Sequence, residues 1–425
     1  MSFLNMVSDN IRRGLVNLKG VELSTDFAVK KEVRAATSIA SPVTINRLDE
    51  TKLKYTNYGF AVVAASYTGT APSNGIQMKL EFMTDSLQFE IKTVGSIATY
   101  SIFIDGKLCN QNAVVTPNGE GVSWINVSAT TGSVVRKMRH VEIYGINSAI
   151  GAVVVAPFDT VTSDIAKVRP FIYQMGDSYT YGTGAAHPLS DYGSSPAIND
   201  FYAYSRALGF DGIAEGIGGS GWNSTGGQYP ATRVSTRLKN LNRKPDVISF
   251  ALGYNDAAAI MTGTNKDKLV ASMGEAVSAA RDAWPGVPVI IISCATPKGI
   301  TANIQAVYDL IKEFCFNSGV ELIEVSDAVT SANSSVYTGT DNVHPNGVGH
   351  QYRGLTAARY VYNKALSGTC LIPDFSRGFT VNFIKKDGFS VEVLSEVVNA
   401  SSQEEAEQKV KYREIGKPSL RIEII

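Results

Sequence analysis

Cysteine and histidine are scarce in this chain of 425 residues, which contains four of each. The cysteines lie far apart, so they form neither the CxxC pairs of a zinc site nor the dense framework of a disulfide scaffold. We interpret most or all of them as buried thiols, and we expect no metal and no cofactor. The residues concerned are Cys109, Cys294, Cys315 and Cys370, with His140, His187, His344 and His350.

Net charge and long apolar runs are lacking as well. The 39 basic and 39 acidic residues cancel, which disfavours a nucleic-acid binder that neutralises phosphates. The longest strongly apolar run, residues 288–295, is far shorter than the roughly 20 residues that span a bilayer. The first twenty residues have no continuous apolar core of the secretory type. We therefore expect no nucleic-acid partner and no membrane, and a protein that is cytoplasmic, exported by another route or released by lysis.

Residues 1–40 form the first expected segment, an N-terminal helical arm. Leu4, Val7, Ile11, Leu15 and Leu18 recur at spacings of three and four, which predicts one amphipathic helix. Two interpretations stay open: the helix anchors the protein or joins it to other copies, or it packs on its own chain.

Residues 41–165 have a different pattern, with short β-rich runs separated by Gly, Asn, Ser and Thr. Regularly spaced short strands without long helical patterns predict an antiparallel β-sandwich, which we expect to be jelly-roll-like. This domain either binds carbohydrate or only packs beside the next domain. The runs are residues 59–67, 76–83, 87–94, 99–106 and 139–145.

From residue 166 to residue 368, strand-like runs alternate with helical ones. This alternation predicts an α/β domain with a parallel sheet covered on both faces, whose functional sites gather at the carboxyl ends of the strands. The expected strands are 171–175, 245–253, 287–295 and 320–327, and the expected helices are 200–210, 266–284, 302–319 and 349–366.

Residues 371–425 are expected to form a small α+β module. The runs FTVNFI and FSVEVL flank the turn KKDG and predict a hairpin, and SLRIEII predicts a final strand. Between them a capping-box pattern predicts a short helix. The pattern pairs Ser401 or Ser402 with Glu404 or Glu405.

Ser178 lies in the segment MGDSYTYG, directly after the first strand of the α/β domain. A serine hydroxyl needs a neighbouring base to become a nucleophile, and a strand end can offer a backbone N–H to the developing oxyanion. The alternative is an ordinary Asp-Ser turn.

Asp341 and His344 lie three residues apart in DNVHP. Asp341 can accept the Nδ1–H of His344, which fixes the tautomer and leaves Nε2 free as a base. The alternative is an Asx turn beside a surface histidine.

Two further motifs follow strands. In GYND (residues 253–256), Asn255 can offer its amide to an oxyanion, although it can equally cap a helix. In GIGGSGWN (residues 216–223), consecutive backbone amides can converge on an anion, although the stretch also fits a flexible loop.

Taken in order, these motifs resemble the SGNH (GDSL-type) hydrolase family over roughly residues 168–366. The resemblance implies a flavodoxin-like, three-layer fold and acyl transfer to water without a metal. It implies that Ser178 is the nucleophile, that His344 is the base and that Asp341 orients His344. The implied oxyanion hole consists of the backbone N–H groups of Ser178 and Gly221 and the side chain of Asn255, with Gly219 as the alternative glycine. Tyr179 stands where the family usually has leucine.

The motif loops are rich in aromatic and polar side chains that suit sugar rings. We expect Tyr179, Trp222 and Tyr254 to contact substrate, although such aromatics can also pack between loops. The prediction is an O-deacetylase of a polysaccharide. Alternatives are a non-catalytic glycan-binding protein and a lipid-directed esterase. The architecture resembles a bacteriophage tail or tailspike protein, located in a virion or outside the cell. We therefore expect a homo-oligomer, or attachment to a larger particle through the N-terminal arm.

Overall fold

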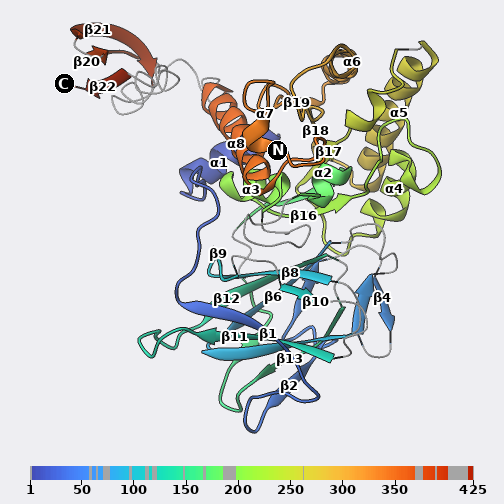
Figure 1. Cartoon of the computed structure of the whole chain (residues 1–425), viewed down its shortest axis with the longest axis vertical. Helices are drawn as coiled ribbons and strands as arrows, with labels where there is room; N and C mark the ends of the chain where they lie inside the picture. Colours follow the sequence, from blue (N-terminus) through green and yellow to red (C-terminus); the bar gives the residue numbers. More distant parts are fainter. Residues whose placement is uncertain are drawn as a thin grey trace. The chain divides into compact units, whose positions relative to one another are not determined.

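A computed structural model of the chain divides into two compact units, Met1–Asn363 and Lys364–Ile425 (Figure 1). Every helix among the described residues is too short or too polar to cross a bilayer. Of the cysteines, Cys294 and Cys315 are buried, Cys109 is half-buried, and Cys370 lies outside the described residues. The structure describes residues 2–56, 60–63, 66–69, 77–94, 98–110, 114–116, 122–146, 149–165, 169–184, 198–261, 263–368, 377–387, 390–400 and 420–424.

The predicted β-sandwich is present as two antiparallel sheets that share one core. In β7, Phe89 and Ile91 point into that core and are fully buried, as the alternating pattern of the strand requires. Phe82 of the opposite sheet meets Phe89 edge-on at 5.5 Å. The first sheet has the order β1 (Phe27–Val33), β11 (Val122–Ala129), β7 (Gln88–Val94), β13 (Ala149–Val155), β5 (Ser66–Gly69), β4 (Phe60–Val63), with β2 (Val43–Asn46) on β13. The second has the order β10 (Val114–Thr116), β8 (Ala98–Ile104), β12 (Arg139–Ile146), β6 (Gln77–Thr84), β14 (Val161–Thr162), with β3 (Lys54–Thr56) on β6 and β9 (Lys107–Leu108) on β8.

The N-terminal segment differs from the expected arm. Helix α1 (Phe3–Arg12) ends before Gly14, which adopts a φ of 66°, and β1 already belongs to the sandwich. The ring of Phe3 packs 5.6 Å from that of Phe210, and Asn10 Nδ2 donates hydrogen bonds to the carbonyls of Leu208 and Gly209. The helix therefore packs on its own chain, which is one of the two interpretations that the sequence left open.

The α/β part contains one sheet of five parallel strands. Its order places the second strand of the domain outside the first, as in flavodoxin-like folds, so a switch point lies between β15 and β17. This confirms the expected fold class. The strands, in spatial order, are β16 (Asp211–Gly216), β15 (Phe171–Gly176), β17 (Val247–Ala251), β18 (Val289–Ile292) and β19 (Glu321–Ile323).

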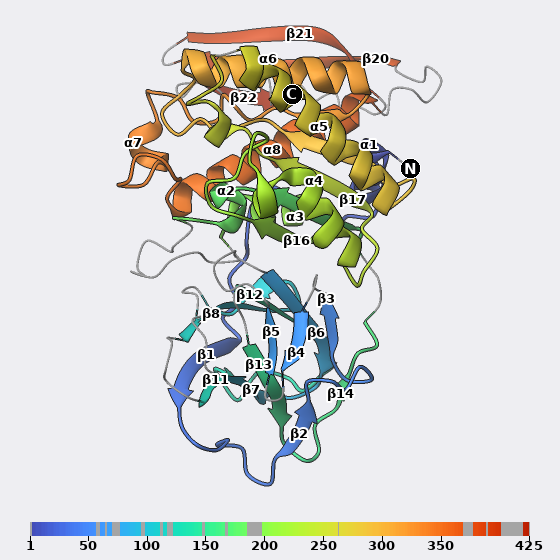
Figure 2. The same ribbon diagram turned by 90° about the vertical axis from the view of Figure 1, so that its right-hand side faces the viewer.

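Helices cover both faces of this sheet (Figure 2). Buried residues of α4 (Pro230–Thr236), α5 (Gly263–Ala283) and α6 (Ala302–Ser318) form one apolar core with the strands. On the other face lie α3 (Asp200–Ala207) and α8 (Gly347–Gly368), which approach each other where Gly354 meets Ala203. The three layers bring the carboxyl ends of β15, β16 and β17 to one edge. Shorter helical turns are α2 (Ser178–Tyr181), α7 (Ser334–Tyr337), η2 (Gly226–Gln228), η3 (Leu238–Asn240) and η4 (Tyr254–Asp256).

A buried charge cluster joins the sandwich to the start of β16. The ammonium group of Lys79 lies 2.9 Å from carboxylate oxygens of Glu81 and Glu142 and 2.5 Å from Asp211. Burial alone would lower the pKa of Lys79, but these three carboxylates hold the pKa well above its usual value. The cluster lies at the amino-terminal end of the parallel strands, opposite the edge that carries the polar motifs.

The second unit contains an antiparallel sheet with the order β21 (Ser390–Ala400), β20 (Arg377–Asp387), β22 (Leu420–Ile424). The hairpin and the final strand expected from the sequence are thus confirmed. The short helix expected at residues 401–405 lies outside the described residues.

Candidate active site

Ser178 begins the short helix α2, immediately beyond the carboxyl end of β15. Asp177 caps this helix by accepting a hydrogen bond from the backbone N–H of Tyr179 at 2.9 Å. Gly176 is required just before the turn, because a Cβ there would lie 1.9 Å from Thr180 Oγ1. The tight turn places the Ser178 hydroxyl at the switch point of the sheet.

His344 and Asp341 complete a chain of hydrogen bonds to Ser178. His344 Nε2 lies 2.8 Å from Ser178 Oγ, and His344 Nδ1 lies 2.6 Å from Asp341 Oδ2. Since a carboxylate only accepts, the proton belongs on Nδ1 and Nε2 accepts from the hydroxyl. The structure therefore brings together the three side chains that the sequence selected.

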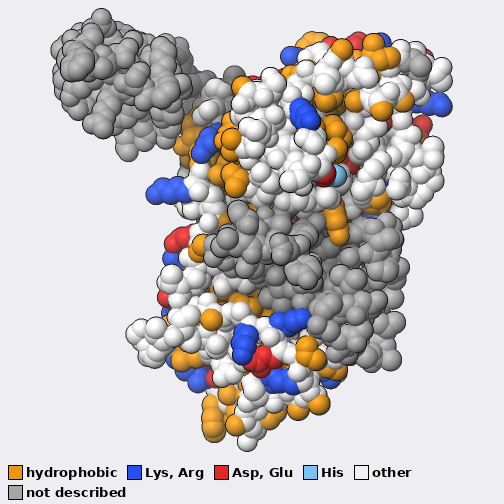
Figure 3. All heavy atoms as spheres, in the orientation of Figure 1, with side chains coloured by type: hydrophobic (Ala, Val, Ile, Leu, Met, Phe, Trp, Pro, Cys, Tyr) orange, Lys and Arg blue, Asp and Glu red, His pale blue; other side chains and the backbone are white. Residues whose placement is uncertain are grey.

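Asp341 also shapes the loop that carries His344. Its Oδ1 accepts the backbone N–H groups of Val343 at 2.9 Å and His344 at 3.0 Å. Burial alone would raise the pKa of Asp341, but the hydrogen bonds from the His344 ring and from these N–H groups hold it below its usual value. Side-chain exposure is 49% for Asp341 and 19% for His344, so the site opens to solvent. Figure 3 shows one histidine side chain that reaches the surface on the face in view, with an acidic side chain beside it.

Tyr179 holds the histidine loop rather than offering a surface to substrate. Its side chain is almost fully buried, its hydroxyl donates a hydrogen bond to the carbonyl of Val343, and its ring lies 5.6 Å from that of His344. The expectation that Tyr179 contacts substrate is therefore wrong. The residue that replaces the family's usual leucine ties the nucleophile turn to the histidine loop.

The GYND segment holds the glycine loop, which we define as residues 216–223, through hydrogen bonds. Asn255 Nδ2 donates to the carbonyl of Ser220 at 2.8 Å and lies 3.4 Å from Asp177 Oδ2. The carboxylate of Asp256 accepts the backbone N–H groups of Trp222 and Asn223, both at 2.8 Å. Burial raises the pKa of Asp256 despite these bonds. Both polar residues of the motif thus fix the loop that faces Ser178.

Gly221 is not available as an oxyanion donor in this structure. Its backbone N–H donates to Ser224 Oγ at 2.8 Å, and a Cβ at this position would lie 2.6 Å from Asp256 Oδ2. Gly221 is therefore a glycine because Asp256 approaches closely. Gly219, by contrast, is exposed, has a φ of 75°, and its N–H has no acceptor in the part of the chain that the structure describes. The geometry favours Gly219, the alternative that the sequence left open.

Trp222 is a core residue, and its expected contact with substrate is wrong. It is fully buried and packs against Phe250, with ring centroids 5.6 Å apart. Tyr254 remains half-buried beside Tyr179. Burial, followed by the charges of Asp341 and Asp177, raises the pKa of Tyr254. Of the three aromatic residues that the sequence selected for substrate, Tyr254 alone keeps a partly exposed ring.

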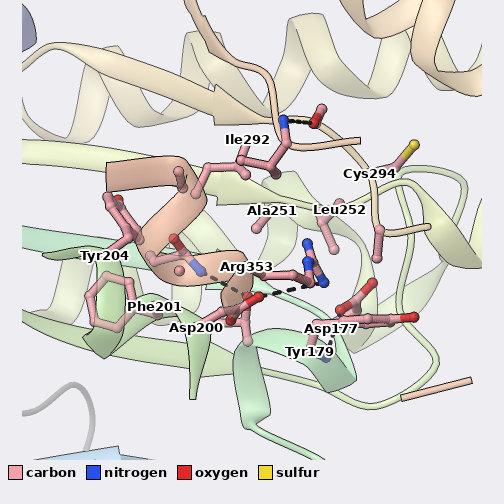
Figure 4. Close-up of a pocket in the computed structure, with 17 residues that line it drawn as sticks. Asp177, Tyr179, Asp200, Phe201, Tyr204, Ala251, Leu252, Ile292, Cys294 and Arg353 are labelled. Atoms are coloured by element: carbon pink, nitrogen blue, oxygen red, sulfur yellow. Dashed lines mark hydrogen bonds and ion pairs between the residues drawn. The ribbon is translucent and has the colours of Figure 1, made fainter. Parts of the chain in front are cut away.

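Asp177 and Tyr179, the neighbours of Ser178 in the chain, line a small and mostly apolar cavity of about 30 Å³ (Figure 4). Arg353 of α8 reaches into it, pairs with Asp200 at 3.5 Å and covers the ring of Tyr179 at 5.0 Å. Burial raises the pKa of Asp177 in the same cavity to about 7. Arg353 and Asp200 leave no signal in the sequence, because neither stands in a motif and their approach depends on how α3 and α8 pack.

No group of three or more His, Cys, Asp or Glu side chains in the described part of the chain is arranged to hold a metal ion. The site is built from a hydroxyl, an imidazole, a carboxylate and backbone donors. Such groups can carry out nucleophilic acyl transfer.

Three of the solved structures with the same fold align with this protein over 99% of their own length. A salicylyl-acyltransferase, SsfX3, from a tetracycline biosynthetic pathway is 17% identical, covers 78% of this chain and has a TM-score of 0.57. A family two carbohydrate esterase from Clostridium thermocellum in complex with cellohexaose is 15% identical, covers 73% and has a TM-score of 0.53. An acetyl xylan esterase (Est2A) from the rumen bacterium Butyrivibrio proteoclasticus is 14% identical, covers 77% and also has a TM-score of 0.53.

No curated protein matches the chain. The model of the GDSL-like lipase/acylhydrolase family, in contrast, matches residues 175–352, the range that contains Ser178, the glycine loop, GYND and DNVHP. This range lies in the parallel-sheet part, and it ends inside α8. The part of the chain that carries these motifs is therefore similar in sequence to the GDSL-like lipase/acylhydrolase family, whose members are hydrolases that act on esters.

Proposed function

We propose that this protein is a serine esterase that removes acyl groups, specifically O-acetyl groups, from a polysaccharide. The observation that carries the proposal is the continuous chain of hydrogen bonds from Asp341 through His344 to Ser178. A carboxylate that accepts the Nδ1–H of the imidazole leaves Nε2 free to take the serine proton.

In the proposed reaction, Ser178 Oγ attacks the ester carbonyl as its proton passes to His344 Nε2. Asp341 stabilises the imidazolium that forms. The tetrahedral oxyanion accepts hydrogen bonds from the backbone N–H groups of Ser178 and Gly219 and from the amide of Asn255, which gives up its long 3.4 Å contact with Asp177 Oδ2 to do so. His344 then donates its proton to the sugar oxygen as the bond between that oxygen and the acyl carbon breaks, so the sugar leaves as an alcohol and an acyl-enzyme remains. A water molecule, deprotonated by His344, releases the acid and restores Ser178.

Two features support a carbohydrate as the alcohol part of the ester. The half-exposed ring of Tyr254 flanks the triad and offers a flat face of the kind that stacks on sugar rings. The carbohydrate esterase and the acetyl xylan esterase named above align over 73% and 77% of this chain. The α/β part is less than 73% of the chain, so each alignment also includes strands of the sandwich.

The phage tail setting, attachment through the N-terminal arm and homo-oligomerisation stay predictions. The apolar side of α1 is occupied by contacts such as that between Phe3 and Phe210, so attachment would use another surface. Mass spectrometry of candidate bacterial surface glycans, before and after incubation with the protein, tests the setting. Loss of acetyl groups from such a glycan supports it, and no change in any host glycan argues against it.

The direct test of the proposed function is Ser178→Ala. We expect the wild-type protein to release acetate from an acetylated polysaccharide and from a chromogenic acetyl ester, and we expect the variant to lose both activities. Because Ser178 is a small residue in a turn held by backbone contacts, the variant should fold normally. Ser235→Ala, which changes an exposed serine of α4, is the matched control and should keep full activity. Wild-type turnover by Ser178→Ala would refute the assignment of the nucleophile.

The same assays separate the alternatives. A non-catalytic glycan-binding protein would bind polysaccharide and release no acetate at any pH. A lipid-directed esterase would show activity that rises steeply with acyl chain length. We expect activity to fall toward low pH, because only the neutral imidazole of His344 can take the serine proton.

A further inference from the structure

Arg233 of α4 lies fully buried beneath the glycine loop. Its Nε donates to the carboxylate of Glu215 at 3.0 Å, and Nη2 donates to the same carboxylate at 2.6 Å. Nη2 also donates to the carbonyl of Gly176 at 2.7 Å and to that of Glu215 at 3.0 Å, while Nη1 donates to Ser220 Oγ at 3.0 Å. One guanidinium group therefore joins the ends of β15 and β16 to the glycine loop.

Two of these acceptors, the carbonyl of Gly176 and the hydroxyl of Ser220, belong to residues that adjoin the proposed oxyanion hole. Gly176 stands two residues before Ser178, whose N–H is one donor. Ser220 directly follows Gly219, the second donor, and the carbonyl of Ser220 accepts the amide of Asn255, the third. A change in the position of Arg233 would thus move all three donors relative to one another.

The planar fork of an arginine suits this task. It offers five N–H donors in a fixed plane, whereas a lysine offers a point charge with three donors at one position. Stability alone does not call for such a pair, because a buried ion pair contributes little more than well-packed apolar residues of the same volume. A role in stability also leaves unexplained why Arg233 donates hydrogen bonds to Ser220 of the glycine loop and to Gly176 at the end of β15.

We propose that Arg233, held by its counter-ion Glu215, is a positioning residue that sets the geometry of the oxyanion hole through Gly176 and Ser220. This proposal rests on the proposed esterase function. Arg233 touches no substrate, and its effect passes through the backbone groups that it fixes.

The first test compares the kinetic constants of Arg233→Met and Arg233→Lys with those of the wild type on a chromogenic acetyl ester. A displacement of about 1 Å in a catalytic group can cost about 10²-fold in rate, so we expect kcat to fall about 10²-fold for Met and less for Lys. We expect KM to change by less than about threefold, because transition-state stabilisation is lost rather than substrate binding.

Arg237→Met is the matched control. Arg237 donates to the same carboxylate of Glu215 from one turn further along the chain, so both variants remove one cation from the same buried anion. We expect Arg237→Met to lower thermal stability as Arg233→Met does, and to keep kcat close to the wild-type value. If both variants lose kcat in proportion to their loss of stability, Arg233 has only a structural role and the proposal is wrong.

The deciding test is a double-mutant cycle with Asn255→Ala, which removes one oxyanion donor. If Arg233 acts through the oxyanion hole, Arg233→Met should cost much less in kcat when Asn255 is already alanine. Equal fold losses in both backgrounds would overturn the proposal. Phosphonate labelling of Ser178 gives the fraction of active enzyme, which corrects kcat for misfolded protein. Should Arg233→Met fail to fold, the cycle with Arg233→Lys gives the same decision.

These outcomes are distinct from failure of the proposed function. If Ser178→Ala keeps the esterase activity of the wild type, the hydrolase assignment itself fails. If activity depends on Ser178 while Arg233→Met keeps wild-type kcat, only the positioning role fails.

Discussion

Replacing Asp341 by asparagine should inactivate the protein by placing the His344 proton on the wrong nitrogen. Oδ1 of Asp341 accepts two backbone N–H groups, those of Val343 and His344, and Oδ2 accepts the ring N–H at 2.6 Å. An asparagine has one acceptor end and one donor end. With its oxygen toward the two backbone donors, its NH₂ group faces Nδ1. The ring must then carry its proton on Nε2, where it cannot take the proton of Ser178.

The magnitude follows from the alternatives open to the variant. Turning the amide over restores the productive tautomer but directs the NH₂ group at two backbone donors, which forfeits two hydrogen bonds of about 1 kcal/mol each. The negative charge that stabilises the imidazolium is also lost, and beside a half-exposed carboxylate this is of the order of 1–3 kcal/mol. The total, about 3–5 kcal/mol, corresponds to a loss of about 10²–10⁴-fold in kcat.

The assay is acetate release by equal amounts of correctly folded Asp341→Asn, Asp341→Ala and wild type. In Asp341→Ala, water can accept the Nδ1–H at this exposed position, so the productive tautomer stays accessible. We therefore expect the asparagine variant to be less active than the alanine variant, although it is the closer replacement in shape. A kcat for Asp341→Asn within about threefold of the wild type would refute the tautomer argument.

Three further predictions concern the charge cluster, the buried acid and the aromatic ring. Lys79→Met should lower the free energy of unfolding in urea by about 3–5 kcal/mol, because Glu142 and Asp211 lose a buried partner, and an unchanged midpoint would contradict this. Burial raises the pKa of Asp177 from 3.8 to about 7, so the folded state binds the extra proton between these values and stability falls as pH rises through that window. Asp177→Asn, compared with wild type by thermal unfolding at pH 5 and pH 8, should remove that fall, which is at most about 4 kcal/mol over the whole window and about 3 kcal/mol between these two pH values. Tyr254→Ala should raise KM for an acetylated oligosaccharide and leave KM for a small chromogenic ester unchanged, and equal effects on both would place the ring outside the sugar site.

Much of the fold was predictable because buried parallel strands and their covering helices leave strong periodic patterns. The last long helix was expected at residues 349–366 and spans Gly347–Gly368. Strand β1 was not recognised, since Lys30, Lys31 and Glu32 interrupt its apolar pattern on the exposed side of an outer strand. The apolar spacing that predicted the arm continues to Leu18, but the helix stops at Arg12 because Gly14 adopts a left-handed conformation.

The triad was predictable for a different reason. Asp341 and His344 share one short loop, so their spacing alone constrains their geometry, and Ser178 follows a strand at the expected edge. The oxyanion donor was not predictable to the residue. Whether the N–H of Gly219 or that of Gly221 is free depends on Ser224, whose hydroxyl takes the second. The fate of an N–H group in a glycine-rich loop is decided by tertiary contacts that no local pattern records.

The prediction that Tyr179 and Trp222 contact substrate is wrong for a related reason. Trp222 belongs to a site motif in the sequence. In the structure, however, the backbone N–H of Trp222 donates to the carboxylate of Asp256, and the Trp222 ring is buried against Phe250. Tyr179 is turned inward by its hydrogen bond to the histidine loop. Being close to a motif in sequence therefore placed these rings near the site without placing them on its surface.

Three carboxyl groups, Asp177, Glu215 and Asp256, lie buried around a site that must stabilise a negative charge. Left unopposed, they would disfavour the oxyanion through like-charge repulsion in a medium of low polarity. The negative charge of each carboxyl group is offset in a different way. The guanidinium of Arg233 neutralises Glu215, and burial raises the pKa of Asp177 to about 7, so that this group is largely protonated below neutral pH. The charge of Asp256 is met by two backbone N–H groups. Arg233 and the N–H groups bound to Asp256 also fix the glycine loop, so for Glu215 and Asp256 the bonds that offset the charge are the bonds that position the loop.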